Sequence, residues 1–467
     1  METTNSANRI NRMPITRYHK LIIIVVAVAY FFEFADINTF STTAPKIAQA
    51  WDLDVNHVAY ITSISFVGMF IGSLLGGWLA DRAGRKMAFL YSTLWFSVFS
   101  AATIFSWNMS SMGVLRFLTC GGLSAMTVVA VIYVNEIFPA KVRGKYLAYA
   151  MVVGICGTPV TNLIASAVVP LTDWSWRLVF LWGTLGVVIL FLIRHLPESP
   201  IWLESKRRFG RAEAVLGEME SKISDLAGQL SAPAPPVAEV KEQKKSGFRT
   251  LMQRRYLMPL LVLVVLWVTQ TVGFFGYSSW APTLLSKQGI SVEDSILYVA
   301  LATIGAPLGS LLAAFITDKF ERKWLLVIFG TAIGIAGLLY GLTFNPIMVV
   351  VFGFLVNMFE RGYTSLAYAY SPELFDTRTR SLGTGIAYGV GRLSNAVGPL
   401  VIAGLYTSSG YVSVFIFIAC TWFIGAVVLA LVGSKTKVEH SAQGPENESP
   451  QVASASIRSI TTGRYEY

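Results

Sequence analysis

Apolar stretches long enough to cross a membrane recur along almost the whole chain. About 20 helical residues cross the roughly 30 Å hydrocarbon core of a bilayer. Twelve stretches reach that length: 21–41, 57–80, 86–107, 110–134, 145–169, 176–195, 257–280, 295–317, 324–344, 347–370, 381–405 and 412–433. Since lipid cannot satisfy backbone hydrogen bonds, these stretches must be helices. The sequence therefore predicts an all-α membrane protein with twelve transmembrane helices.

Lysine and arginine are distributed unevenly between the predicted loops. They are concentrated before the first stretch and after every second one, whereas the opposite loops contain almost none. By the positive-inside rule, both termini are cytoplasmic. The net charge of +10 belongs to this bias, so the expected partner is the lipid bilayer and not nucleic acid. We expect a multi-pass protein of the plasma membrane, in a bacterium the inner membrane, with the first stretch retained as an anchor.

A long polar insert separates the first six stretches from the last six. The predicted organisation is a cytoplasmic tail over 1–20, a six-helix bundle over 21–197, a cytoplasmic linker over 198–255, a second bundle over 256–433 and a cytoplasmic tail over 434–467. The linker begins with helical periodicity, while SAPAPPVAEVKEQKKS at 231–246 is typical of a flexible segment. The C-terminal tail is polar, and we expect it to be disordered.

The two halves repeat the same phrases. GSLLGGWLADRAGRK at 72–86 is matched by GSLLAAFITDKFERK at 309–323. The same offset relates NEIFPAKVRG to PELFDTRTRS, and it pairs Asp81 with Asp318, Glu136 with Glu373 and Arg143 with Arg380. A single offset indicates a duplicated six-helix unit in parallel orientation, because an even number of crossings returns the chain to the same side. Parallel six-helix repeats are the architecture of the major facilitator superfamily.

The first of these phrases resembles the signature of that superfamily. GGWLADRAGRK matches G-x-x-x-D-R-x-G-R-[RK] at Gly77, Asp81, Arg82, Gly84 and Arg85. NEIFPAKVRG and LPESPIWLES resemble phrases of its sugar and metabolite porter branch. The resemblance implies that Asp81 lies at the N-terminus of helix 11, where the helix dipole favours an anion. It also implies a conformational latch, in which Arg85 and Arg143 pair with Glu136. The second-half counterparts of the latch residues are Asp318, Glu373 and Arg380.

Charged residues inside the apolar stretches are the strongest functional signal. Each costs roughly 2.5 to 3.5 kcal/mol near the middle of a membrane helix, so it is seldom kept without a partner or a water-filled path. Glu33 and Asp36 lie one turn apart in the first stretch and share a face. Arg116 lies at the same depth as Asp36, so we expect an ion pair. The others are Glu360, Arg361 and Arg392.

The first stretch also resembles a narrower group, the aromatic-acid:proton symporters and related nicotinate transporters. FEFADINTFSTTAPKIAQAW is similar to their D-x-x-D-x-(n)-A-P region, with Glu33 at the first Asp and Asp36 at the second. RFLTCGGLSAM and VGRLSNAVGPL resemble their phrases in helices 4 and 11, which gives Arg392 a matching arginine. Met126 stands where some members carry an acid, so the expected proton-coupling residues are Glu33, Asp36 and Arg116.

These residues predict transport by alternating access. Protonation of Asp36 from outside would break its pair with Arg116, and substrate binding would then favour opening toward the cytosol. Arg392 is the candidate to hold a substrate carboxylate with both oxygens; the alternative is a pair with Glu360 that only packs the second half. Further candidates for the substrate cavity, each with packing as the alternative, are Gln270, Tyr277, Asn357, Tyr388 and Asn395.

The predicted function is proton-coupled uptake of a small aromatic or heterocyclic carboxylate by a monomeric transporter. A sugar or polyol porter is the alternative, because it shares the NEIFPAKVRG and PESP phrases, although TQTVGFFGYSS lacks the usual sugar contacts. A drug:proton antiporter and a transport-dead nutrient sensor are further alternatives. No nucleophile–base pair or metal-ligand cluster emerges, and the three cysteines lie within apolar stretches. We therefore expect neither an enzyme nor a cofactor nor a bound metal.

Overall fold

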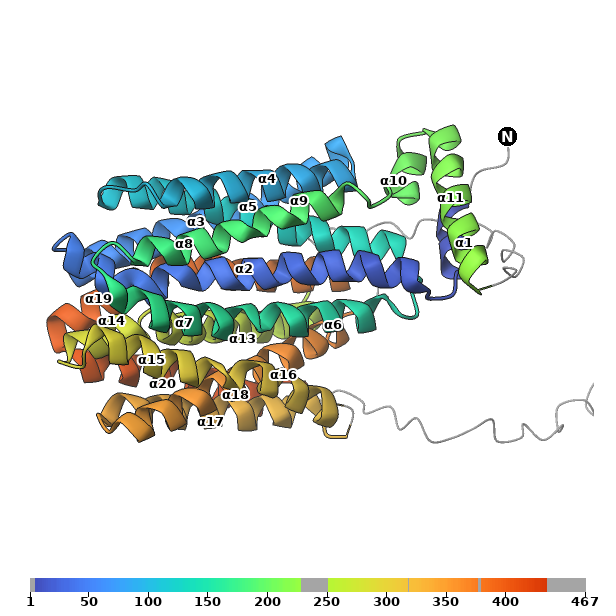
Figure 1. Ribbon diagram of the computed structural model, residues 1–467. Helices are drawn as coiled ribbons and strands as arrows, with labels where there is room; N and C mark the ends of the chain where they lie inside the picture. The colour runs from blue at the N-terminus through green and yellow to red at the C-terminus, as the bar shows by residue number, and fades with distance from the viewer. Residues whose placement is uncertain (1–4, 228–250, 318, 377–378, 435–467) are drawn as a thin grey trace, which may run out of the picture.

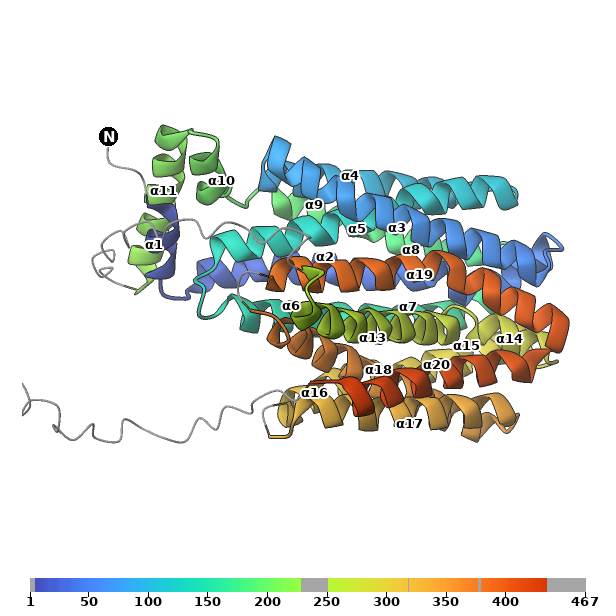
Figure 2. The ribbon, with the colours of Figure 1, turned by 180° about the vertical axis from the view of Figure 1, so that it is seen from behind.

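The computed structural model describes residues 5–227, 251–317, 319–376 and 379–434, and in them all regular structure is helical. The predicted flexible segment at 231–246 and nearly all of the C-terminal tail lie outside these residues. The long helices lie side by side in one bundle (Figure 1). Figure 2 shows the opposite face, where α19 runs between α3 and α13.

The first half begins with the short helix α1 and contains six membrane-spanning segments. Two of the spans are interrupted by a tighter turn, one after Ile155 and one at the 3-10 turn Leu185–Val187. The helices are α1 (Ser6–Asn11), α2 (Arg17–Ala50), α3 (Val55–Ala83), α4 (Arg85–Thr103), α5 (Met109–Ile137), α6 (Arg143–Ile155), α7 (Gly157–Val168), α8 (Trp176–Thr184) and α9 (Val188–Ile193). In the predicted linker, α10 (Pro200–Ser205) and α11 (Phe209–Ala227) follow.

The second half repeats this order. Its helices are α13 (Arg254–Ser278), α14 (Ala281–Lys287), α15 (Val292–Thr303), α16 (Gly305–Ile316), α17 (Arg322–Leu342), α18 (Pro346–Glu373), α19 (Arg380–Ser409) and α20 (Tyr411–Val432). With α6–α7, α8–α9 and α15–α16 each taken as one span, every predicted stretch corresponds to a helical span. The predicted all-α fold with twelve spans is confirmed.

Helix ends follow local sequence signals. Asp54 and Asn108 cap α3 and α5 by accepting hydrogen bonds from backbone N–H groups three residues on, which satisfies donors that the helix leaves unpaired. Gly84 separates α3 from α4 with a φ of 98°, and Gly410 separates α19 from α20 with a φ of 82°. Both angles lie in the left-handed region that favours glycine.

Helix α4 is less apolar than the other spans. By length and composition, eleven spans in the described part of the chain could cross a membrane, and α4 is not among them. Its buried face is polar, because Ser92, Thr93, Ser97, Ser100 and Thr103 all point inward. Backbone carbonyls of α4 accept hydrogen bonds from two of these hydroxyls. The lower hydropathy of this span therefore reflects inward-facing hydroxyls in a helix that packs against α5 and α8 like any other member of the bundle.

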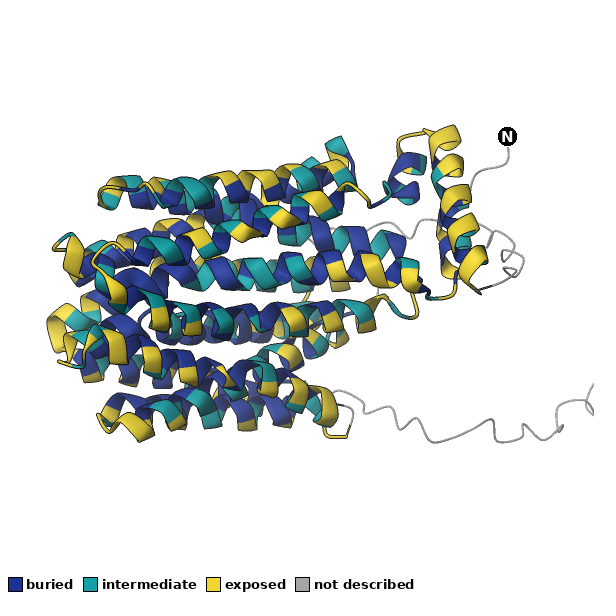
Figure 3. Ribbon diagram, viewed as in Figure 1, coloured by how far each residue is buried: buried dark blue, intermediate teal, exposed yellow. Residues whose placement is uncertain are grey.

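The outer faces of the bundle are apolar. Large exposed hydrophobic side chains lie on many of the spans, for example Leu74 (61% exposed), Ile347 (70%) and Leu431 (79%). Figure 3 shows exposed residues as stripes along the outer helices. Apolar side chains on the outside of a helical bundle are expected where the solvent is lipid.

The two ends of the bundle differ. We call the end where α1, α10 and α11 lie the linker end, and the opposite end, which includes α14, the loop end (Figure 1). One buried hydrophobic cluster joins the second half to loop-end residues of the first half, including Phe40, Ile47, Val58 and Trp176. A separate cluster fills the first half at the linker end and contains no second-half residue. Within the described part of the chain, the two halves therefore share a buried hydrophobic core only at the loop end.

The N-terminal segment is packed against the linker. Ile10 and Met13 are buried in one cluster with Leu216, Met219 and Ile223 of α11. Arg9 forms ion pairs of 2.7 Å with Glu220 and 2.6 Å with Glu213, and Arg12 forms one of 2.6 Å with Glu220. The hydrogen bonds with Arg9 lower the pKa of Glu220. The region expected as a simple tail at 1–20 thus holds a helix, and α2 begins at Arg17, inside that region.

Candidate functional site

Asp36 and Arg116 form a fully buried ion pair in the first half. Nη1 of Arg116 lies 2.6 Å from Oδ1 of Asp36, and the two side chains are 2% and 0% exposed. Ser100 of α4 donates a 2.7 Å hydrogen bond to Oδ2, and the guanidinium lies 5.9 Å from the ring of Phe180. The ion pair expected from matching depth is therefore present. It is enclosed by α2, α4, α5 and α8.

Two residues at this pair gave no signal in the sequence. Ser100 is one of several hydroxyls in α4, and only the packing shows that it bonds to Asp36. Gly183 lets α8 pass close by, because a Cβ atom there would lie 2.8 Å from Oδ2 of Asp36. Glycine is therefore favoured where α8 crosses the carboxylate, because even the methyl group of alanine would crowd it.

A central cavity of about 170 Å³ lies between the two halves. Glu33 lines it from α2, one helical turn from the sealed Asp36. Of the residues expected to line it, Gln270, Tyr388, Arg392 and Asn395 do so. Its remaining lining is mostly apolar and aromatic, and includes Phe34, Phe66, Phe70, Trp267, Phe274, Phe275 and Tyr368.

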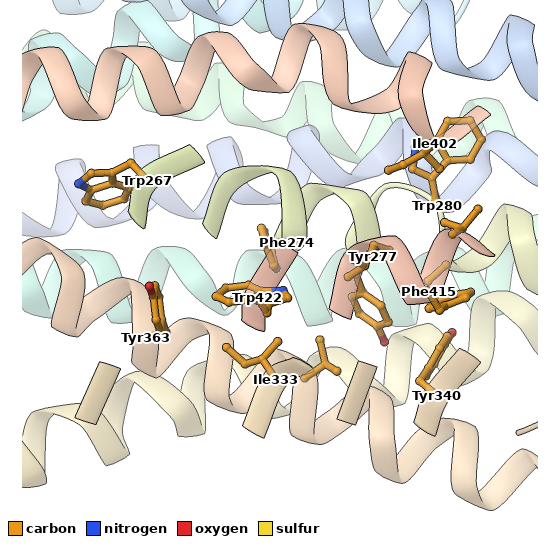
Figure 4. Packing of buried hydrophobic residues seen from close by; sticks show 14 of the residues in the cluster. Trp267, Phe274, Tyr277, Trp280, Ile333, Tyr340, Tyr363, Ile402, Phe415 and Trp422 are labelled. Atoms are coloured by element: carbon orange, nitrogen blue, oxygen red, sulfur yellow. The ribbon is translucent and has the colours of Figure 1, made fainter. Parts of the chain in front are cut away.

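Two residues expected in this cavity lie elsewhere. Tyr277 and Asn357 line a small adjoining pocket of about 10 Å³ and not the central cavity. The ring of Tyr277 is buried against Tyr340, with centroids 5.1 Å apart, and Asn357 donates a 2.8 Å hydrogen bond to its own helix at Gly353. Figure 4 shows Tyr277 among the aromatic side chains of the second-half core. The rotation of each helix in the bundle, which a sequence does not specify, decided both positions.

Arg392 reaches the cavity without a carboxylate partner among the described residues. Its Nη1 donates a 3.3 Å hydrogen bond to Ser124 of the first half, and its guanidinium lies 4.8 Å from the ring of Tyr388. The pair with Glu360 that was the alternative for this residue does not form, because Glu360 pairs with Arg361. An arginine in this position can offer its planar fork to a carboxylate.

Glu360 and Arg361 form a second acid–arginine pair, in α18. Their atoms Oε2 and Nε are 3.3 Å apart, and the side chains are 0% and 13% exposed. Gln270 and Thr364 donate hydrogen bonds of 2.9 and 2.7 Å to Oε1 of Glu360.

Arg361 faces the cavity, with its guanidinium 4.6 Å from the ring of Phe274 and 5.3 Å from that of Phe34. Its charge was noticed in the sequence, but it was not selected as a site residue. Its place within the tenth apolar stretch was the available signal.

An aromatic cluster closes one side of the cavity. The ring of Trp267 lies 4.8 Å from both Tyr368 and Tyr388, and the Tyr368 hydroxyl donates a 2.7 Å hydrogen bond to that of Tyr388. Gly391 makes room for this cluster, because a Cβ atom there would lie 2.8 Å from Cβ of Trp267. Aromatic faces beside a guanidinium suit a planar anion.

The predicted latch is partly assembled at the linker end. Arg85 lies 2.7 Å from Glu136 and 3.1 Å from Asp81. Asp81 is largely exposed, 74% for its side chain, and its bond is to Arg85 and not to the start of α19. Arg143 reaches the carbonyl of Asn135 at 3.4 Å, and no ion pair with Glu136 is found among the described residues.

Other latch residues differ in their surroundings. Gly84 is required, because a Cβ atom there would lie 2.5 Å from the Glu198 carboxylate, whereas one on Gly77 would meet nothing within 4 Å. Arg82 is exposed over the ring of Trp78. In the second half, Glu373 pairs with Arg322, and Arg380 is exposed. Asp318 lies outside the described residues.

The PESP phrase has a structural role that the sequence did not reveal. Oε1 of Glu198 accepts hydrogen bonds of 2.8 and 3.1 Å from the backbone N–H groups of Arg85 and Lys86. A carboxylate at the first turn of α4 complements the helix dipole. Ser199 donates a 2.5 Å bond to Glu136. The phrase therefore fastens the linker to the signature loop.

A twelve-span helical bundle with a charged cavity between its halves is the architecture of a major facilitator transporter. The chain belongs to the family described as "Sugar (and other) transporter", whose model matches residues 20–440. Among the described residues, no group of three or more His, Cys, Asp or Glu side chains could hold a metal ion. By its family, the protein is a membrane transporter and not an enzyme.

Relatives match the chain over nearly their full length. YyaJ of Bacillus subtilis (strain 168), whose name describes metabolite transport, is 40% identical, over 93% of this chain and 97% of its own. The niacin transporter NiaP of Acinetobacter baylyi is 29% identical, over 92% and 97%. The 4-hydroxybenzoate transporter PcaK of the same organism is 29% identical, over 91% and 93%.

A solved structure shares the fold. The xylose transporter XylE from E. coli, in a partially occluded inward open conformation, superposes with a TM-score of 0.73 at 17% identity. The match covers 90% of this chain and 99% of that one.

Proposed function

We propose that the protein takes up a small aromatic or heterocyclic carboxylate together with protons. The observation that carries this proposal is Arg392, a cation in the central cavity with no carboxylate partner within 4 Å among the described residues. An unpaired charge at membrane depth is costly, so a substrate anion is the natural partner. The aromatic cluster beside it fits a planar ring, and two relatives are named for niacin and 4-hydroxybenzoate.

The proposed proton-coupling residues are Glu33, Asp36 and Arg116. Glu33 meets the cavity, while Asp36 meets Arg116 on the buried side of the same helix. Because the two acids are one turn apart on α2, a tilt of this helix changes the surroundings of both. In the mechanism that we propose, Glu33 exchanges its proton with the cavity, and the Asp36–Arg116 pair holds α2 against α5 and α8.

The proposed transport cycle is alternating access of two bundles, 21–197 and 256–433, joined by the linker at 198–255. The core shared only at the loop end fits a state closed at that end. With both termini in the cytoplasm, as the charge pattern predicts, this state faces inward. In the outward-facing state we propose that Asp81 moves to the N-terminus of α19 and completes the latch. The protein acts as a monomer in the inner membrane of a bacterium.

Substitution of Arg392 tests the proposed substrate class. Arg392→Lys keeps the charge but loses the planar fork, so carboxylate binding should weaken; Arg392→Gln should weaken it further, by about 10- to 100-fold, because a charge-assisted hydrogen bond contributes about 1.5 to 3 kcal/mol. The measurements are thermal stabilisation and proteoliposome uptake with nicotinate, 4-hydroxybenzoate and xylose. Arg211→Gln, on the exposed face of α11, is the matched control.

A sugar or polyol porter is the second candidate. The amide side chains of Asn38 and Asn395 in the cavity lining favour it, because amides can bond to hydroxyl groups. Xylose uptake that is insensitive to Arg392→Gln, with no uptake of either acid, would replace the carboxylate proposal with this one.

A further inference from the structure

The charges around the central cavity form a small, closed set. Glu33, Arg361 and Arg392 line the cavity, and Glu360 lies directly behind Arg361, fully buried and 3.3 Å from it. Two carboxylates and two guanidiniums therefore balance when Glu33 is ionised. The Asp36–Arg116 pair is buried and does not line the central cavity, although Arg116 lines a small adjoining pocket of about 30 Å³. Its two charges balance each other.

Among the described residues that line the cavity, Arg361 and Arg392 are the only charged side chains besides Glu33. The first-half helices α3 and α6 present only apolar side chains, Phe66, Met69, Phe70, Met151 and Ile155, and α13 presents the neutral Gln270. The titratable or charged groups that α18 and α19 present to the cavity are Arg361, Tyr368, Tyr388 and Arg392. On its own helix, Tyr30 is buried one turn away and Asp36 is paired. Glu33 is thus the cavity's acid, and its nearest unpaired counter-charge is Arg392.

We propose that the site takes up one proton on Glu33 for each substrate carboxylate, so that a monocarboxylate is transported without net movement of charge. This inference rests on the proposed function. It adds the number of protons per substrate and the residue that binds the proton. The empty site is neutral with Glu33 ionised. A monoanion bound at Arg392 together with a protonated Glu33 leaves the site neutral again.

The same charge count explains why the proton and the substrate move together. An anion bound beside an ionised Glu33 places two negative charges in one low-dielectric cavity, and a proton bound without the anion leaves Arg392 uncompensated. Either half-loaded state has a net charge, which is costly to enclose at membrane depth. Only the empty and the fully loaded sites are neutral, so those two states change conformation most readily.

Membrane potential provides the test. Proteoliposomes take up labelled nicotinate or 4-hydroxybenzoate under a pH gradient with the potential clamped at zero, and then under a potassium-diffusion potential without a pH gradient. One transported unit charge would change the accumulation ratio about tenfold across about 60 mV. We expect pH-driven uptake above that of empty liposomes and no effect of a potential of either sign.

Each contrary outcome overturns a different statement. Stimulation by an inside-negative potential means more than one proton per carboxylate, and stimulation by an inside-positive potential means fewer; either overturns the stoichiometry alone. Uptake of neither acid above the level of empty liposomes overturns the proposed function, and the stoichiometry with it.

The variant Glu33→Gln tests whether Glu33 binds the transported proton. This variant leaves the empty site with one positive charge, so it should still exchange labelled for unlabelled acid, but net uptake should lose its response to the pH gradient. Net uptake should instead rise about tenfold in accumulation across about 60 mV, inside positive, because the returning empty carrier now moves a charge outward. Glu293→Gln, an exposed acid in the first turn of α15, is the matched control. pH-driven uptake that persists in Glu33→Gln overturns the assignment to Glu33.

Discussion

Among the described residues, each half has an acid–arginine pair whose acid is fully buried within a membrane span, and the two pairs are built differently. In the first half, both partners of Asp36–Arg116 are sealed and 2.6 Å apart. In the second half, Glu360 is sealed but Arg361 is 13% exposed, 3.3 Å away, and faces the cavity between two aromatic rings. The first pair joins α2 to α5, whereas the second presents a cation to the central cavity.

Breaking the sealed pair should have the largest effect on stability. Arg116→Gln leaves Asp36 buried with only its bond to Ser100, and removing one partner of a buried pair costs about 3 to 5 kcal/mol. We expect a large loss in thermal unfolding of the purified protein. The double variant Asp36→Asn, Arg116→Gln should recover much of it, because no charge is then left unpaired.

The sealed pair could instead serve transport directly. This would be the conclusion if Arg116→Gln unfolded at the same temperature as the parent but lost pH-driven uptake. The proposed contrast between a structural pair and a cavity-facing pair would then be wrong.

Breaking the cavity-facing pair should cost less. Glu360→Gln keeps acceptors for Gln270 and Thr364, and Arg361 retains its contacts with Phe274 and Phe34. We expect a loss of about 1 to 3 kcal/mol, the scale of a single buried polar contact. Because the cavity gains a positive charge, nicotinate should bind more tightly in this variant. A stability loss equal to that of Arg116→Gln, with unchanged nicotinate affinity, would show that the two pairs are alike.

The partly exposed ion pairs between α1 and α11 should contribute least to stability. Arg9→Gln removes the ion pairs of α1 with Glu213 and Glu220, and partly exposed pairs contribute less than about 1 kcal/mol. The pKa of Glu220 is lowered in the folded protein, so its contribution is present above the ordinary glutamate range and is lost as the pH falls through the lowered value. The melting temperatures of parent and variant should differ slightly at pH 7 and converge in acid. A difference that grows with acidity would contradict this.

The two pairs also show which site residues the sequence could predict and which it could not. The cost of a charge in an apolar stretch identified Glu33, Asp36, Arg116 and Arg392, and matching depth was enough to predict the Asp36–Arg116 pair. The same reasoning could not identify Arg361 as a cavity residue. The cost of a charge implies that it has either a partner or a water-filled path, but it does not say which of the two applies. Tyr277 was expected in the cavity because its ring would suit a planar substrate. In the structure it lies on a face of α13 that packs against Tyr340 instead.

By itself, the sequence determined the spans, their number and the repeat, because membrane insertion is decided by the summed transfer energy of each segment. It also placed the charges within the spans, because the cost of a charge in a membrane segment depends on local energetics. The tertiary structure alone decided which faces of the helices meet. It turned Glu33 toward the cavity and buried Asp36 against Arg116. It also paired Glu360 with Arg361, which left Arg392 without a carboxylate partner among the described residues, and it packed α1 against α11. These outcomes depend on helix rotation and on contacts between segments far apart in the chain, and a linear pattern of residues contains neither.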